Sequence, residues 1–122
     1  MKLIKIALVA LLVSTTVSAA GNVASGKKVF KKINCALCHN ADGMGKAKGG
    51  KLALLKGPQI AGLDAAYIVE QLEAIKSKKR KTKYTTMMWT KIRKLSSQDM
   101  ADLGAYVHQL SKTRFKGMKQ AK

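Results

Sequence analysis

The chain has 122 residues, a usual length for one domain, and its 47% hydrophobic composition is enough for a modest core rather than a disordered tail. The formal net charge of +18 is large for this length and indicates acidic partners or an anionic surface. Nucleic acid is the poorer partner, because only 5% of the residues are aromatic and no base-stacking motif occurs.

Residues 1–20 have the pattern of a secretory signal peptide, with two lysines, then an apolar stretch, then small residues. Cleavage is expected after Ala19 or Ala20, which leaves a mature domain of residues 21–122. An uncleaved membrane anchor is the alternative, although the apolar stretch is well short of the roughly 20 residues that a spanning helix needs. Export places the two cysteines of the chain in an oxidising compartment.

Three helices are expected from the spacing of apolar residues. The first covers residues 24–33, where apolar or small side chains recur at i, i+3, i+4 and i+7 between lysines. The second begins after Asp64, a suitable N-cap, and ends among lysines that favour a helix C-terminus. The third begins after Ser96, which with Asp99 resembles a capping box.

Two long loops, residues 40–57 and 77–95, separate these helices. Helices this short are marginal in isolation, and their apolar faces are small. The expected fold class is therefore all-α, with three main helices whose core needs an additional component for the loops to wrap.

The run C-A-L-C-H at residues 35–39 contains both cysteines and one of the two histidines. Cys-x-x-Cys-His is the attachment motif of c-type haem, in which two thiols form thioethers with the porphyrin and the imidazole binds the iron. A haem would also supply the missing core component, and the loops would form the walls of its pocket.

Three other interpretations of this run are weaker. A disulfide between Cys35 and Cys38 would close a very small loop and constrain little of the unfolded chain. Zinc needs four ligands, and the adjacent Cys38 and His39 would have difficulty reaching one tetrahedral ion together. A thioredoxin-like redox pair belongs at a strand-to-helix junction, whereas this pair follows a lysine-rich helix.

The second axial ligand of the iron decides the function, because a carrier needs both axial positions filled and an oxygen- or peroxide-handling site needs one open. The candidates are His108 and a methionine, chiefly Met87 or Met88. His108 follows the core position Val107, so it is expected to point to solvent. Met87 and Met88 lie in the second loop, which must cover the haem, and a thioether is a known partner of iron opposite histidine.

These features together resemble the small bacterial class I c-type cytochromes. The resemblance rests on C-A-L-C-H, on the turn G-P-Q-I-A-G at residues 57–62, on the helix containing Tyr67 and on the stretch of residues 87–107. It spans essentially the whole mature chain and implies a class I cytochrome c fold, with long loops wrapped around one haem.

For the site, the resemblance implies one covalently bound haem c attached through Cys35 and Cys38. It implies His39 and Met88 as the axial iron ligands, because in such proteins the methionine lies about seven residues before the Leu-Ser pair that opens the final helix. Met87 is the less favoured alternative.

The resemblance also implies that the Pro58 carbonyl accepts the outer N–H of the axial histidine, which orients the ring and raises its basicity. A plain turn proline is the other interpretation of Pro58. The resemblance likewise implies that Gly26 and Phe30 meet Tyr106 where the first and last helices cross.

Two features of the sequence are unusual for the class I c-type cytochromes that it resembles. Trp89 follows the expected ligand directly, and its ring could lie against the haem or serve as an exposed docking contact. Residues 76–83 carry six basic residues in eight. Such a run is usually a solvated surface, but this one leads into the methionine loop and could steer an acidic redox partner at a salt-sensitive rate.

The expected function is that of a soluble periplasmic electron carrier with one haem, not an enzyme. The alternative is a haem c subunit that accepts electrons within a larger oxidoreductase complex, and a third hypothesis is a haem enzyme or gas sensor with an open sixth position. The expected partners are acidic redox proteins or an oxidoreductase complex, with association with an anionic membrane surface as a further option, and no nucleic acid.

Overall fold

A computed structural model of the chain describes residues 20–45, 57–82 and 84–111. The expected signal peptide, apart from its last residue, lies outside these residues. The described parts contain five helices and no strand, so the all-α prediction is confirmed. The helices are α1 (Val23–Lys32), α2 (Ala36–His39), α3 (Ala65–Lys76), α4 (Thr85–Ile92) and α5 (Ser97–Gln109). No helix among the described residues is long and apolar enough to cross a membrane.

The three expected helices are α1, α3 and α5, and each begins at a side-chain N-cap. Asn22 accepts the Ser25 N–H at the start of α1, and Asp64 accepts the Tyr67 N–H at the start of α3. At α5, Ser96 and Asp99 accept from each other's backbone N–H, which is the predicted capping box. The N–H and O–H donors of Ser96 lower the pKa of the Asp99 carboxyl.

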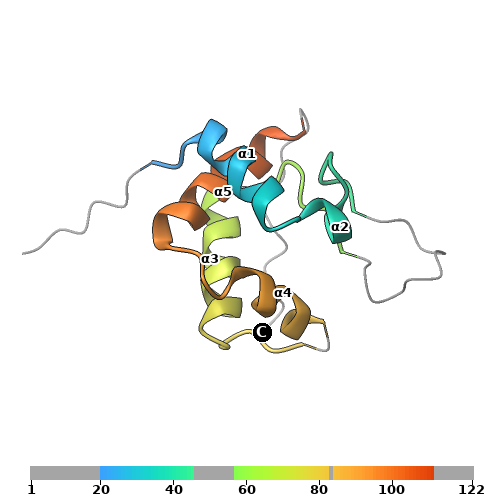
Figure 1. The fold of residues 1–122 in the computed structure, drawn as a ribbon, viewed down its shortest axis with the longest axis vertical. Coiled ribbons are helices and arrows are strands. Elements are labelled where there is room, and N and C mark those ends of the chain that lie inside the picture. The colour runs from blue at the N-terminus through green and yellow to red at the C-terminus, as the bar shows by residue number, and fades with distance from the viewer. Residues whose placement is uncertain (1–19, 46–56, 83, 112–122) are drawn as a thin grey trace, which may run out of the picture.

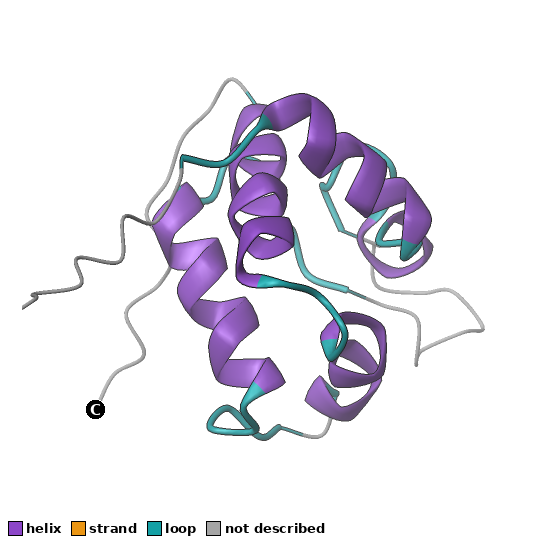
Figure 2. Ribbon diagram, turned by 60° about the vertical axis from the view of Figure 1, so that its left-hand side comes forward, coloured by secondary structure: helices purple, strands orange, loops and turns teal. Residues whose placement is uncertain are grey.

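Helix α5 is the central helix of the fold (Figures 1 and 2). It packs against α1 on one side and α3 on another, while α4 packs against α3. Apolar side chains from these four helices and from the segment between α4 and α5 form one core. Its buried members are Phe30, Ile68, Leu72, Ile75, Ile92, Leu95, Met100, Leu103 and Val107.

Helices α1 and α5 cross as closely as the resemblance implied. A Cβ on Gly26 would lie 2.0 Å from the Asp102 carbonyl oxygen, so only glycine fits. The rings of Phe30 and Tyr106 meet edge to face, with centroids 5.3 Å apart. Asp102 itself is buried, and its carboxylate accepts the Asn22 N–H at 2.7 Å. The expected contact of Gly26 and Phe30 with Tyr106 is thus confirmed.

The second loop differs from the prediction, because α4 lies within it. The start of α4 carries no side-chain cap at Tyr84, so its sequence lacks the signal that marks the other helices. Tertiary contacts stabilise it instead: Ile92 is completely buried, and Met88 and Trp89 pack against the core. The expectation of an unbroken loop over residues 77–95 was wrong.

Candidate haem-binding site

Helix α2 and its N-cap, Cys35, form the C-A-L-C-H run, a single helical turn between α1 and the first loop. The chain leaves α1 through Asn34, whose φ of 57° turns the backbone sharply, and the Cys35 N–H then bonds the Phe30 carbonyl at 3.0 Å. The turn closes where the His39 N–H bonds the Cys35 carbonyl at 3.0 Å. Cys35 and Cys38 are both half-buried free thiols. Both sulfurs and the adjacent imidazole therefore come from one short, hydrogen-bonded element.

The His39 ring is held by a backbone carbonyl from the turn that precedes α3. Its Nδ1 lies 2.8 Å from the Pro58 oxygen, the contact that the resemblance implied. Because a carbonyl only accepts, Nδ1 must carry the proton, and Nε2 keeps a free lone pair. Burial lowers the pKa of His39, with the Pro58 bond opposing that effect, so the neutral ring is favoured. A neutral imidazole with a free Nε2 is the form that binds metals.

Gly57 fits against this ring in a way that no other residue could. A Cβ at this position would lie 2.6 Å from Nδ1 of His39 and 2.8 Å from the Cys38 carbonyl oxygen. The Gly57 N–H donates to that same Cys38 carbonyl at 2.8 Å. The sequence marked Gly57 only as the start of a turn, whereas its role here is close contact between the turn and α2.

Helix α4 lies on the same side of α3 as α2 does (Figures 1 and 2). The positive charge of Lys91 on α4 lowers the pKa of the Cys35 thiol. Its effect is small beside burial, which raises the pKa of Cys35 to about 11. Cys35 and Met88 also pack against the same core cluster.

The two methionines of α4 face different ways. Met88 is half-buried and precedes the buried Ile92 by four residues, so the two share one helix face. Met87 is 41% exposed and shares its face with the exposed Thr90 and Lys91.

The sequence predicted that His108 points to solvent, and this prediction was wrong. It is half-buried, and its Nδ1 lies 2.7 Å from the carbonyl oxygen of Leu63. This bond ties the end of α5 to the segment that precedes α3. The helical pattern of α5 could not reveal it, because the acceptor is a backbone atom 45 residues away.

The basic run of residues 76–83 is not one uniform solvated face. Lys76 donates to the Leu95 carbonyl, and Arg80 donates to the Gln71 side chain at 2.8 Å. Lys78 is exposed, and its ammonium lies over the Trp89 ring. Lys83 lies outside the described residues.

The residues of this site fit a covalently bound haem. Two free thiols two residues apart can each form a thioether, and the following imidazole offers a free nitrogen. An all-helical fold with this arrangement defines a class of protein, the covalent haem carriers.

Residues 23–111 match the family described as Cytochrome c. The chain is 36% identical over 88 residues to cytochrome c4 of Pseudomonas aeruginosa, an alignment that covers 72% of this chain and 38% of the relative. It is 31% identical over 87 residues to cytochrome c-554(548) of Halomonas halodenitrificans, which covers 71% of this chain and 94% of the relative. The chain therefore spans well under half of the first relative and nearly all of the second.

The chain belongs to the cytochrome c family. It is a c-type cytochrome, an electron carrier rather than an enzyme, as the sequence predicted. Family membership implies a covalent haem c and redox proteins as partners.

Proposed function

We propose that this cytochrome works in the periplasm, carries one haem attached through Cys35 and Cys38, and holds the iron between His39 and Met88. The haem, when bound, supplies a one-electron ferrous–ferric couple. The observation that best supports this proposal is the hydrogen bond between His39 Nδ1 and Pro58, because it leaves Nε2 of a neutral, oriented ring available to a metal.

Met88 is the better choice for the other axial position. Its side chain is half-buried on the core-facing side of α4 and packs against the same core cluster as Cys35. Met87 directs its thioether away from the core and is 41% exposed. A ligand must reach inward to the iron, so the orientation of α4 favours Met88.

Export and haem attachment can be tested in one measurement, the intact mass of protein from the periplasmic fraction. The expected mass is that of a chain starting at Ala20 or Gly21 plus one haem. The double variant Cys35→Ser/Cys38→Ser should lack the haem mass, because both thioether sulfurs are gone. A wild-type chain that contains no covalent haem, or that retains residues 1–19, would contradict the corresponding part of the proposal.

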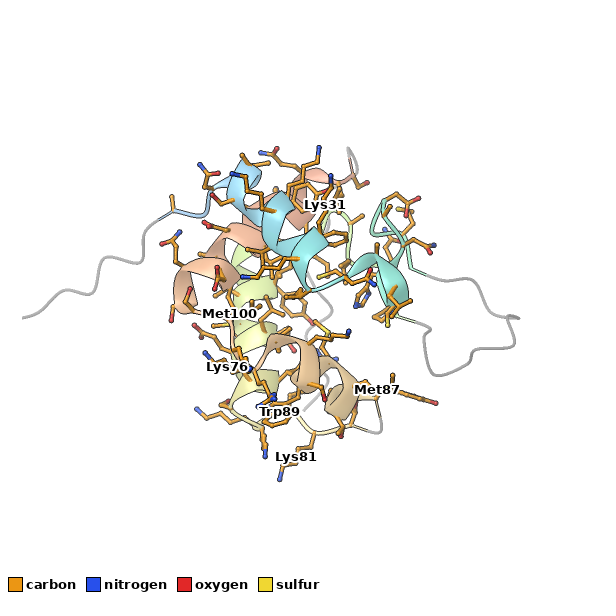
Figure 3. All side chains as sticks on the ribbon, viewed as in Figure 1. Lys31, Lys76, Lys81, Met87, Trp89 and Met100 are labelled. Atoms are coloured by element: carbon orange, nitrogen blue, oxygen red, sulfur yellow. The ribbon has the colours of Figure 1, made fainter. Side chains whose placement is uncertain are left out.

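The basic surface around α4 supports an acidic redox partner. No acidic residue occurs between Glu73 and Asp99. The exposed basic residues of this α4 surface are Lys78, Lys79, Lys81, Lys91, Arg93 and Lys94. Figure 3 shows Lys81 beside α4 and Lys31 at the opposite end of the molecule. Charge gathered around the methionine helix would attract an anionic partner to that side.

Removal of three charges from the α4 surface should slow electron transfer to an anionic oxidant. In Lys79→Gln/Lys81→Gln/Lys94→Gln, oxidation of the ferrous protein by hexacyanoferrate(III) is expected to slow about tenfold at low salt, and the difference should vanish at high salt. The matched control is Lys27→Gln/Lys28→Gln/Lys31→Gln, which removes the same charge from α1. Equal slowing in both triple variants, measured by stopped-flow, would show that net charge rather than this surface matters.

A further inference from the structure

Trp89 directly follows Met88, and its ring is held on several sides. The indole Nε1–H donates to the Lys76 carbonyl at 3.1 Å. The Lys78 ammonium lies 4.5 Å from the ring centroid, and the Arg93 guanidinium carbon lies 5.4 Å from it. The side chain is half-buried and packs against the core. These contacts join the end of α3, the basic loop and α4 (Figure 3).

The hydrogen bond from Trp89 to the Lys76 carbonyl stabilises the C-terminus of α3. Lys76 is the last residue of α3, where carbonyl groups lack partners within the helix. The indole satisfies one of them, and the Lys76 ammonium in turn donates to Leu95, just beyond α4. Two bonds from one residue of α3 therefore hold the second half of α4 and the segment that follows it.

Helix α4 needs this support. It has eight residues and no side-chain cap at its first turn, and helices of this length are marginal without tertiary contacts. Ile92 supplies an apolar contact, but an apolar contact has no direction. The indole N–H does have direction, so it fixes the rotation of α4 about its own axis.

We propose that Trp89 is a positioning residue that holds Met88 toward the iron. This inference rests on the proposed role of Met88 as axial ligand. Because Met88 and Trp89 are adjacent in one helical turn, the direction of the thioether follows the direction of the indole. The cations of Lys78 and Arg93 both lie close to the ring, and these contacts resist its rotation.

The test compares two variants of Trp89 in the full-length haem-loaded protein. Trp89→Phe keeps an aromatic ring but loses the N–H, and Trp89→Leu loses both the N–H and the cation–π contacts. The expected result is a weaker sulfur-to-iron charge-transfer band, with carbon monoxide binding to the ferrous protein about tenfold faster in Trp89→Leu and by a smaller factor in Trp89→Phe.

A control variant with a similar expected loss of stability distinguishes the positioning role of Trp89 from a purely structural role. Asn22→Ala removes the N-cap of α1, away from α4, and should leave both the band and the carbon monoxide rate unchanged. If Trp89→Leu behaves like Asn22→Ala, the positioning role is wrong. If Trp89→Leu does not accumulate, Trp89→Phe decides by the same readouts.

The same spectra test the positioning role of Trp89 and the assignment of Met88 as ligand independently. A charge-transfer band that is present in the wild type and lost in Met88→Ala, but unchanged in both Trp89 variants, would overturn the role of Trp89 only. A wild type without the band, or a band that persists in Met88→Ala, would overturn the ligand assignment and the inference together.

Discussion

Met88→Ala is expected to abolish the sulfur-to-iron charge-transfer band of the haem-loaded protein and to lower its reduction potential. A neutral thioether favours the ferrous state, and its loss leaves the position to water or another donor. Axial ligands set haem potentials over a range of about 0.8 V, so the decrease should be a substantial part of that range. The measurements are a visible and near-infrared spectrum and a potentiometric titration.

Met87→Ala is the matched control for this prediction. It removes the same side chain from the neighbouring position, where the thioether is 41% exposed. Its spectrum and potential should stay near those of the wild type, and surface substitutions of this kind usually change stability by about 0.5 kcal/mol or less. Loss of the band in Met87→Ala with retention in Met88→Ala would reverse the ligand assignment.

The sequence predicted the three main helices because their signals are local. Asn22, Asp64 and Ser96 precede apolar periods and cap their helices through bonds to the third residue that follows. Helix α4 was missed because its stability is not local: it starts at Tyr84 without a cap and depends on packing by Ile92. A short segment of this kind cannot be told from a loop by periodicity.

The candidate site likewise has residues that the local sequence identifies and residues whose contacts only the fold determines. The covalent motif is contiguous, so residues 35–39 could be recognised directly, and family resemblance pointed to Pro58. The contacts of His108 and Trp89 end on backbone carbonyls of Leu63 and Lys76, which carry no mark in the sequence. Periodicity therefore placed His108 toward solvent, and the sequence left Trp89 open between a place against the haem and an exposed docking contact, without indicating its bond to the end of α3.

Gly57→Ala is expected to destabilise the protein by about 1–3 kcal/mol, because the added methyl would overpack the turn against α2. The Cβ would lie 2.6 Å from Nδ1 of His39, 2.7 Å from its Cε1 and 2.8 Å from the Cys38 carbonyl oxygen. The Cys38 carbonyl is backbone and already accepts the Gly57 N–H, so it has little freedom to move. The imidazole must therefore shift, and its bond to the Pro58 carbonyl is the contact most directly at risk.

A steric clash at residue 57 and a change confined to the unfolded state would shift the free energy of unfolding in opposite directions. The φ of Gly57 is not in the left-handed region, so alanine meets no backbone strain there. Without a steric clash, glycine to alanine would instead stabilise by about 0.4–1 kcal/mol through the unfolded state. Urea unfolding followed by circular dichroism measures the difference, with Gln59→Ala, an exposed neighbour, as the control expected within about 0.5 kcal/mol of the wild type. A Gly57→Ala variant more stable than the wild type would show that the turn does not press on His39, and a destabilised variant with an altered reduction potential would tie this contact to the ligand.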